Sequence, residues 1–409
     1  WLIFDEYPER SLAADLGLAL ALAARRKLGA AFRLLVMSAT LDAERVAALL
    51  EDAAVVTVPG RAFEVQIRYL GRGAPILPAG SDAARGADAA ALERAVARAI
   101  ALALEQSPGD VLAFLPGVGE IRRVQGQLGV QALPPDVQVL PLYGQMSAQM
   151  QDAVLAPASA GTRKVVLATN VAETSLTIPG VTAVVDSGLV RRSRFDPVSG
   201  MSRLELMRIS RAASEQRAGR AGRTAPGVCY RLWSEGAHES LAAGTAPEIL
   251  EADLAPLALE LARWGVADAA RLSWLDAPPA AALEQARELL ARLAALDERG
   301  RLSARGREMA RVPAHPRLAH MLLAARELDC VPLAARLAAL LSERDLLTSA
   351  RGDGGSRGER DPDIRSRLEL LQPGGRAGAP AAAVQQLQRA ARALEAALPA
   401  PASASAAAP

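Results

Sequence analysis

Several residue types that would support particular folds are scarce in this chain of 409 residues. Its two cysteines, Cys229 and Cys330, are too few and too far apart for a disulfide framework, and with the three histidines they form no zinc-ligand spacing. No run of about 18 apolar residues is without charge; residues 12–24 are apolar but contain Asp15. We therefore expect a cytoplasmic protein with no membrane partner.

A strong excess of one charge is also missing, because the formal net charge is only +2. Any nucleic-acid track must therefore come from local clusters rather than from an overall basic field. The 51% hydrophobic content and the length are sufficient for two or three hydrophobic cores. The composition thus describes a globular protein with more than one domain.

Apolar strand patterns alternate with helical patterns up to about residue 235, which predicts α/β domains built on parallel sheets. We expect residues 1–72 to be the C-terminal part of a first domain and residues 73–235 to form a second, complete one. The strand pattern at 63–69 would close the first domain. From residue 236 helical patterns take over, and residues 398–409 form an Ala/Pro tail that we expect to be disordered.

The most informative motif is Gln-Arg-Ala-Gly-Arg-Ala-Gly-Arg at residues 216–223. Arginine supplies planar, permanently charged forks that match phosphate oxygens, and such charges stabilise the transition state of phosphoryl transfer. A basic, glycine-rich run taken alone is more often a solvated loop. The interpretation as a phosphate site therefore depends on the other motifs in the chain.

Three further motifs each follow an apolar strand pattern. Asp5-Glu6 follows residues 1–4, Ser38-Ala39-Thr40 follows residues 34–36, and Ala-Thr-Asn-Val-Ala-Glu-Thr-Ser-Leu-Thr-Ile at 168–178 follows residues 165–167. Functional residues of parallel sheets gather at the carboxyl ends of the strands. A lone Ser-Ala-Thr is weak evidence, but the ordered set of four motifs is specific.

With this ordered set the chain resembles the DEAH/DExH-box helicases of superfamily 2, from Trp1 to about Leu347. The resemblance extends to residues 114–121, 142–146 and 315–318. It implies tandem RecA-like domains, the first one partial, then a degenerate winged helix over 236–312 and a ratchet-like HA2 region over 313–397. It also implies ATP-dependent unwinding of nucleic acid, RNA rather than DNA, with ATP and Mg²⁺ as cofactors.

The same resemblance assigns roles around the nucleotide. Asp5 would hold Mg²⁺, and Glu6 would orient and deprotonate the attacking water. Gln216, Arg220 and Arg223 would reach the γ-phosphate from the second domain.

It assigns further roles in coupling and in nucleic-acid binding. Ser38 and Thr40 would couple hydrolysis to domain movement, and Thr169 and Asn170 would contact the nucleic-acid backbone. A predicted β-hairpin with its turn at 196–200 carries four arginines that could contact phosphates: Arg191, Arg192, Arg194 and Arg203. Exposed arginines that serve only solubility are an equal alternative for this hairpin.

Two positions depart from the family pattern. The usual Asp-Glu-x-His reads Asp-Glu-Tyr-Pro here, and Pro8 has neither a side-chain donor nor a backbone N–H. The bridge that the histidine would make toward Gln216 is therefore lost, which puts the coupling of ATP to nucleic acid in question. Pro179 stands where relatives often carry an acidic residue near the nucleotide, so that contact is not transferred.

A Walker A loop is missing from the chain. This loop needs Gly-x-x-x-x-Gly-Lys-Ser/Thr to hold phosphates and Mg²⁺, and neither of the two lysines, Lys27 and Lys164, follows such glycines. We therefore expect an N-terminally truncated helicase that is inactive alone. The alternative is a nucleotide-independent nucleic-acid-binding or scaffold protein derived from a helicase.

Overall fold

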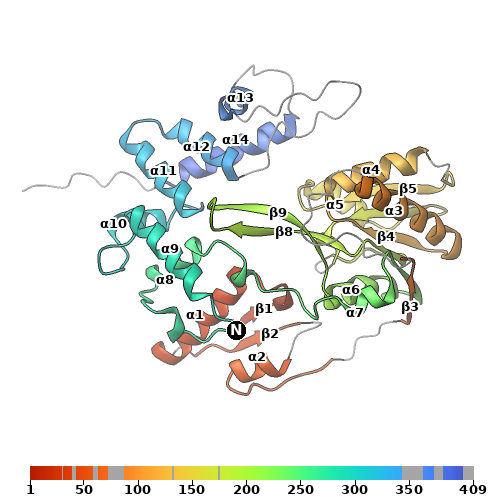
Figure 1. Cartoon of the computed structure of the whole chain (residues 1–409), viewed down its shortest axis with the longest axis horizontal. Coiled ribbons are helices and arrows are strands. Elements are labelled where there is room, and N and C mark those ends of the chain that lie inside the picture. The colour runs from red at the N-terminus through yellow and green to blue at the C-terminus, as the bar shows by residue number, and fades with distance from the viewer. Residues whose placement is uncertain are drawn as a thin grey trace, which may run out of the picture. The chain divides into compact units, whose positions relative to one another are not determined.

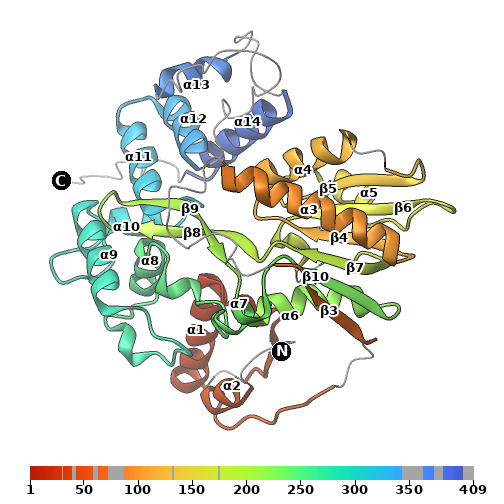
Figure 2. The same ribbon diagram turned by 45° about the vertical axis from the view of Figure 1, so that its right-hand side comes forward.

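A computed structural model of the chain (Figures 1 and 2) describes residues 1–29, 31–38, 43–58, 63–71, 87–130, 133–173, 176–342, 363–372 and 381–398. Thr40 and most of the expected Ala/Pro tail lie outside these residues. The chain divides into two compact units. Unit 1 comprises Trp1–Ala252 and Ser273–Asp276, and unit 2 comprises Asp253–Leu272 and Ala277–Pro409.

The larger of the sheets formed by the described residues of unit 1 has six strands, all paired in parallel. Its strand order is β3-β10-β7-β4-β6-β5. The strands are β3 (Val65–Tyr69), β4 (Asp110–Phe114), β5 (Val137–Leu142), β6 (Arg163–Ala168), β7 (Val181–Asp186) and β10 (Gly227–Arg231). The parallel α/β architecture predicted from the sequence is confirmed.

Helices cover both faces of this sheet (Figure 2). Val111 and Ala113 face a core formed with α3 (Ala87–Gln106) and α4 (Val118–Val130). Leu112 and Phe114 face a second core, which includes residues of α5 (Ala148–Leu155) and α6 (Arg211–Gly219). Strands covered on both sides read as continuous apolar runs, and this is why the sequence marked β4, β6 and β7 clearly.

The strand at 63–69 was expected to close the first domain, and this expectation is wrong. Strand β3 pairs along β10, from Val65 opposite Gly227 to Tyr69 opposite Arg231, and forms the edge of the six-stranded sheet. The short pattern at 227–231 was not recognised as a strand in the sequence. One edge of β10 pairs with β7, and its other edge pairs with β3. The half-exposed side chains of β3 suit its position at the edge of the sheet.

The N-terminal part of unit 1 carries a parallel pair of strands, β1 (Leu2–Phe4) and β2 (Leu34–Val36). Between them lie η1 (Tyr7–Glu9) and α1 (Leu12–Leu28), and α2 (Ala43–Leu49) follows β2. Helix α1 begins at Ser11, whose side chain accepts the Ala14 N–H, and ends at Gly29 in the left-handed conformation. Its apolar face packs on a small core with Tyr7, Leu18 and Val46.

Strands β8 (Leu189–Asp196) and β9 (Met201–Arg208) form the predicted antiparallel hairpin, which extends away from the six-stranded sheet (Figure 1). Asp196 organises the turn, because its carboxylate accepts the Val198 N–H and the Ser199 hydroxyl. Gly200 has φ +65°, a conformation that favours glycine. The remaining short elements of unit 1 are η3 (Asn170–Ala172), η4 (Arg220–Gly222), α7 (Glu235–Glu239) and η5 (Glu248–Leu250).

The regular elements formed by the described residues of unit 2 are helices, apart from a β-bridge between Leu296 and Leu302. The elements are α8 (Ala255–Arg263), η6 (Ala269–Arg271), α9 (Ala280–Arg292), α10 (Ala304–Met309), α11 (Pro316–Glu327), α12 (Val331–Ser342), α13 (Ile364–Leu370) and α14 (Ala381–Ala396). The helical character expected from residue 236 onward is confirmed. Among the described residues, no helix combines the length and the apolar character that a membrane span requires.

Pro247 and Glu248 are typical of a helix start, and apolar residues at Ile249 to Leu261 favour one continuous helix, but the structure breaks it. A turn of 3₁₀ helix, η5, ends at Leu250, and α8 starts at Ala255. Asp253 causes the new start, since its Oδ1 accepts the Ala255 N–H at 2.8 Å. Side-chain acceptors of this kind satisfy the unpaired N–H groups of a first turn.

His315 joins the starts of two helices in unit 2. Its Nδ1 accepts the Arg317 N–H at 3.2 Å and caps α11, while its Nε2 lies 3.0 Å from Asp253 Oδ2. Because Nδ1 accepts, the proton belongs on Nε2, which then donates to Asp253. Burial raises the pKa of Asp253, but the hydrogen bonds from His315 and Ala255 outweigh it and hold that pKa below its usual value.

Replacing His315 with alanine removes the cap and the hydrogen bond together. We expect local stability at the starts of α8 and α11 to fall by about 1–2 kcal/mol at neutral pH, since a cap and a hydrogen bond to a charged group each contribute on that order. Hydrogen exchange of these first turns in the intact chain measures the change. Exchange equal to that of the wild type would contradict the assigned bonds.

The stabilisation by Asp253 should also depend on pH. Its folded-state pKa is lowered, so its contribution is complete above the ordinary pKa and is lost as the pH falls through the lowered value. Asp253→Asn should flatten this part of the pH dependence of α8 exchange. A variant with the wild-type acid response would rule out Asp253 as the titrating group.

Candidate active site and nucleic-acid interface

The arginine-rich motif lies on α6 and on the 3₁₀ turn η4 that continues it. Helix α6 begins at Ser210, whose hydroxyl accepts the Ala213 N–H at 3.1 Å. Gly222 must be small, because a Cβ there would lie 2.5 Å from the carbonyl oxygen of Phe63 at the entry to β3. The small residues of the motif thus allow the close approach to the neighbouring strand, and the arginines project from the same two turns.

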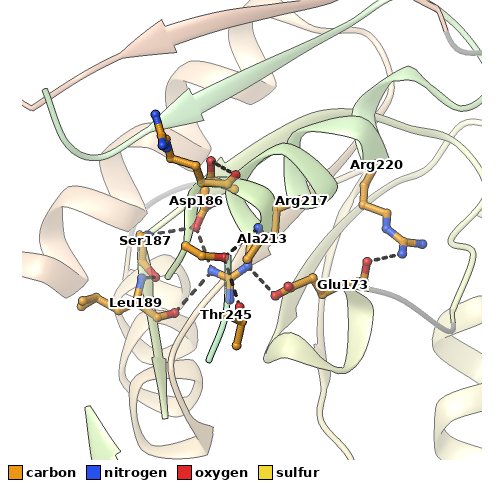
Figure 3. Close-up of polar contacts among 12 residues, drawn as sticks. Glu173, Asp186, Ser187, Leu189, Ala213, Arg217, Arg220 and Thr245 are labelled. Atoms are coloured by element: carbon orange, nitrogen blue, oxygen red, sulfur yellow. Dashed lines mark hydrogen bonds and ion pairs between the residues drawn. The ribbon is translucent and has the colours of Figure 1, made fainter. Parts of the chain in front are cut away.

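The first arginine of the motif, Arg217, is a buried anchor rather than a surface cation (Figure 3). Its Nη1 donates to Asp186 Oδ1 at 2.9 Å, and its Nε donates to Glu173 Oε2 at 2.9 Å. It also stacks over the Phe114 ring, 4.8 Å from the centroid. Burial alone lowers the pKa of Arg217, but Asp186 and Glu173 raise it above the usual value, so the charge is retained.

Sequence reasoning gave no role to Arg217 or to its two carboxylate partners. The motif holds three arginines at equal spacing, and nothing in their order distinguishes the buried one from the others. Asp186 ends β7 and is completely buried. An acidic residue at the end of an apolar strand was the available signal, and it resembles the signal that identified Asp5.

Arg220 is nearly buried on η4 and faces the loop after β6. Its Nη1 donates to the Leu176 carbonyl at 2.8 Å, and its Nη2 donates to the Glu173 carbonyl. Burial and the nearby positive charge of Arg223 lower the pKa of Arg220 to about 10, against the attraction of Glu6 and Glu173. Glu6 therefore lies within electrostatic reach of Arg220. The exposed Arg223 donates to the hydroxyl of Thr177.

Asp5 and Glu6 follow β1 in a turn that is held tightly. Asp5 is exposed, and its Oδ1 accepts the Glu6 N–H at 2.9 Å. Glu6 has a left-handed backbone, φ 50° and ψ 34°, which is uncommon for a residue other than glycine and often marks functional sites. The Tyr7 N–H donates to the Met37 carbonyl, so this turn and the segment that precedes Ser38 are joined.

The side chain of Tyr7 fixes the same turn from behind. Its hydroxyl donates to Asp15 Oδ1 at 2.8 Å inside the small core. Arg10 binds the same carboxylate through Nε at 3.0 Å and Nη2 at 3.1 Å. The backbone of Glu6 thus lies between two anchored points.

A cavity of about 540 Å³ lies between this turn and the arginine motif. Pro8 lines it from one side, and Asn170 and Gln216 line it from the other. Pro8, at the position where the family pattern has histidine, therefore lines the same cavity as Gln216. Proline offers no donor there, so no side-chain hydrogen bond crosses the cavity from this position.

The described residues contain no cluster of three or more carboxylate, histidine or cysteine side chains that could enclose a metal ion. Mg²⁺ bound to a nucleotide does not need such a cluster, since one or two carboxylates, phosphate oxygens and water complete its coordination. The exposed Asp5 carboxylate at the end of β1 fits that requirement. Its Oδ2 is the oxygen not used by the Glu6 N–H.

Thr169 and Asn170 stand where β6 ends, as expected. The Thr169 N–H donates to the Leu142 carbonyl of the neighbouring β5, and Asn170 begins η3 with its side chain exposed. Both residues are therefore at the carboxyl edge of the six-stranded sheet. The motif at 168–178 continues from there to Glu173, which binds Arg217 and Arg220.

The three arginines on β8 differ in their surroundings. Arg191 pairs with Glu120 at 2.8 Å, and Arg192 donates to the Ala246 carbonyl and pairs with Glu251. Arg194 is 56% exposed and has a longer contact of 3.6 Å to Glu205. Arg194 is thus the most accessible of the three to a phosphate.

Two protein families match parts of the chain. The helicase conserved C-terminal domain matches residues 92–225, and the ratchet-like helicase associated domain (HA2) matches residues 315–398. The first match contains four of the six strands of the larger sheet, β4 to β7, and the arginine motif.

Individual proteins match over most of the chain. The ATP-dependent RNA helicase HrpB of Escherichia coli is 48% identical over 342 residues, which cover 84% of this chain and 40% of HrpB. The pre-mRNA-splicing factor ATP-dependent RNA helicase prp22 of Schizosaccharomyces pombe is 36% identical, over 86% of this chain and 29% of its own length. A crystal structure of E. coli HrpB superimposes with a TM-score of 0.76 and 43% identity, covering 95% of this chain and 46% of HrpB.

This chain therefore spans less than half the length of the relatives that it matches. Within that span it has the four motifs, the parallel sheet that carries them and the helical region that follows. The chain belongs to the DEAH/DExH-box family of superfamily 2 helicases, in which it resembles HrpB.

Proposed function

We propose that this protein is part of an ATP-dependent RNA helicase motor, in which hydrolysis between two RecA-like domains drives movement along RNA. The observation that carries this proposal is the cavity that the turn after β1 shares with the motifs of the six-stranded sheet, since Pro8 lines it together with Asn170 and Gln216. Glu6 lies in that turn, and Arg220 lies on η4, which packs against β7 and β10. Residues associated with both sheets thus border one cavity, as catalysis at a domain interface requires.

Each of these residues has a task that its geometry suits. Glu6 would orient and deprotonate the attacking water, and its left-handed backbone is an uncommon conformation of the kind often found at functional sites. Arg220 and Arg223 would stabilise negative charge that develops on the transferred phosphoryl group. Asp5 would hold Mg²⁺, which supplies charge neutralisation at the phosphates when it is bound. Closure around the nucleotide and reopening after hydrolysis would then shift a population between two forms.

The sheet of β1 and β2 supports the proposal that residues outside this chain complete the first domain. Parallel sheets normally have both faces covered and more than two strands. Here Ile3 and Leu35 are 53% and 40% exposed, and Trp1 is 75% exposed. Further strands and helices, including a Walker A loop, would cover these side chains. Without them we expect this chain to be inactive as an ATPase.

RNA is the nucleic acid that we propose, because both curated relatives are named RNA helicases. Thr169 and Asn170 would contact the backbone at the end of β6, and Arg194 on β8 would add a phosphate contact. Ser38, which follows β2, would couple hydrolysis to movement together with Thr40. We further propose a cytoplasmic location, in keeping with the absence of a membrane-spanning helix among the described residues.

A nucleotide-independent RNA-binding protein is the second candidate function. Pro8 favours it, because the cavity between the two sheets lacks the donor that the family pattern places opposite Gln216. The measurement of ATP hydrolysis described below also tests this second candidate. The retained set of Asp5, Glu6, Gln216, Arg220 and Arg223 argues against it, since a protein that only binds RNA has no need of that whole set.

The first prediction from this proposal concerns ATP hydrolysis. The chain alone should show background hydrolysis, whereas a fusion with the preceding part of E. coli HrpB placed before Trp1 should hydrolyse ATP and respond to RNA. In the fusion, Glu6→Gln should lower kcat about a hundredfold or more without weakening ATP binding. Arg220→Ala should lower kcat by about a thousandfold. Steady-state kinetics and ATP binding by equilibrium titration measure both effects.

The matched control is Arg122→Ala, which removes an exposed arginine of α4 outside the proposed site. It should keep the activity of the parent fusion. A fusion that binds RNA but hydrolyses no ATP would support the second candidate function. Near-normal turnover of Glu6→Gln would disprove the general-base role.

The second prediction concerns RNA binding by the 409-residue chain itself. We expect it to bind single-stranded RNA with an affinity that falls as salt rises. Arg194→Ala should reduce the salt slope by about one, as the loss of one phosphate contact does, and Arg122→Ala should leave it unchanged. Asn170→Ala should weaken binding at every salt concentration. Fluorescence anisotropy with RNA and DNA of the same sequence measures these effects and compares the two substrates.

A further inference from the structure

The loop proposed to bind RNA also holds the arginine proposed to act on phosphate. Arg220 donates from Nη1 to the Leu176 carbonyl and from Nη2 to the Glu173 carbonyl. Both carbonyls follow Asn170 on the same loop. The guanidinium is planar and its donors have fixed directions, so it cannot turn fully toward a phosphate while both bonds persist.

Glu173 attaches this loop to the arginine motif at a second point (Figure 3). Its carboxylate accepts from Arg217 Nε at 2.9 Å, one turn before Arg220, while its carbonyl accepts from Arg220 itself. Arg217 is also fixed to the sheet through Asp186 at 2.9 Å. A displacement of Glu173 would therefore alter the hydrogen bonds of both Arg217 and Arg220. Asp186, in contrast, contacts only Arg217 of these two arginines.

The burial of Glu173 makes its ion pair with Arg217 sensitive to a movement of the loop. Burial raises the pKa of the Glu173 carboxyl above its usual value, against the attraction of Arg217. The carboxylate therefore depends strongly on this partner, because water replaces little of the lost interaction if the pair separates. Asn170, three residues earlier, is exposed and accessible to a ligand.

We propose that Glu173 is a positioning residue that holds Arg220 in a resting orientation and releases it when RNA displaces the loop at Asn170. This inference rests on the proposed function and adds a specific link to it. RNA would favour the loop position in which the two carbonyl bonds to Arg220 are broken. Arg220 would then be able to move toward Glu6, whose charge attracts it. The two ligands would be coupled because each favours the same loop position.

Hydrogen exchange measured by mass spectrometry on the 409-residue chain tests the link without requiring ATP hydrolysis. The probe is a single-stranded oligouridine RNA of about 15 nucleotides, long enough to cover one binding track. In the wild type we expect RNA to slow exchange near residues 169–173 and to speed exchange at residues 216–223 by roughly tenfold, as the loss of hydrogen bonds to a charged group would.

Three variants separate positioning from simple structural support. Glu173→Ala should show fast exchange at residues 216–223 already without RNA, with no further increase when RNA binds, and its RNA affinity should not fall. Glu173→Gln keeps an oxygen acceptor for Arg217 and should retain part of the RNA response. Asp186→Asn weakens the other partner of Arg217 and should raise the basal exchange, yet RNA should still increase it.

The outcomes distinguish this inference from the proposed function. If the wild-type chain binds the RNA and exchange at residues 216–223 does not change, the link is wrong and the proposed function stands. The same conclusion follows if Glu173→Ala and Glu173→Gln both respond like the wild type, or if Asp186→Asn abolishes the response as Glu173→Ala does. If the chain does not bind the RNA at all, the proposed function fails, and this inference fails with it.

Discussion

The buried charge of Arg217 is the interaction on which the rest of the site depends. An unpaired guanidinium in the core would be strongly destabilising, so it must be matched there by carboxylates. Asp186 supplies one from the end of β7, and Glu173 supplies the other from the loop after β6. The ion pairs therefore fix α6 against two different parts of the sheet. Because η4 continues α6, they also fix where Arg220 can reach.

A second constraint acts on the other side of the cavity. Parallel strands place the residues that follow them at one edge of a sheet, which explains why Asp5 and Asn170 both come directly after a strand. Edge position alone does not aim a side chain, however. Glu6 has a left-handed backbone, in a turn that Tyr7 and Arg10 stabilise through Asp15. The conformation of the turn at Glu6 thus depends on the core packing behind that turn.

Most of the fold could be predicted from sequence because the signals were local. Doubly covered strands such as β4 are continuous apolar runs, and the Asp196 turn marks the hairpin. The errors arose where tertiary context decides the outcome. Strand β3 joined the second sheet because the edge of β10 accepts it, and Asp253 restarted a helix that the apolar spacing predicted to be continuous. In the site, three equivalent arginines could not be ranked, because burial of Arg217 depends on a distant carboxylate at Asp186.

Pro8 shows how coupling could persist without the family histidine. That histidine would add one hydrogen bond across the cavity, and proline removes it while keeping the turn after Glu6 rigid. In the proposed mechanism, the attraction between Glu6 and Arg220 would still connect the two domains, because a charge–charge interaction acts over a longer range than a hydrogen bond. Such an attraction tolerates a missing contact but depends on where Arg220 is held. If Glu173 holds it as proposed, the loss at Pro8 places more of the coupling on the loop after β6.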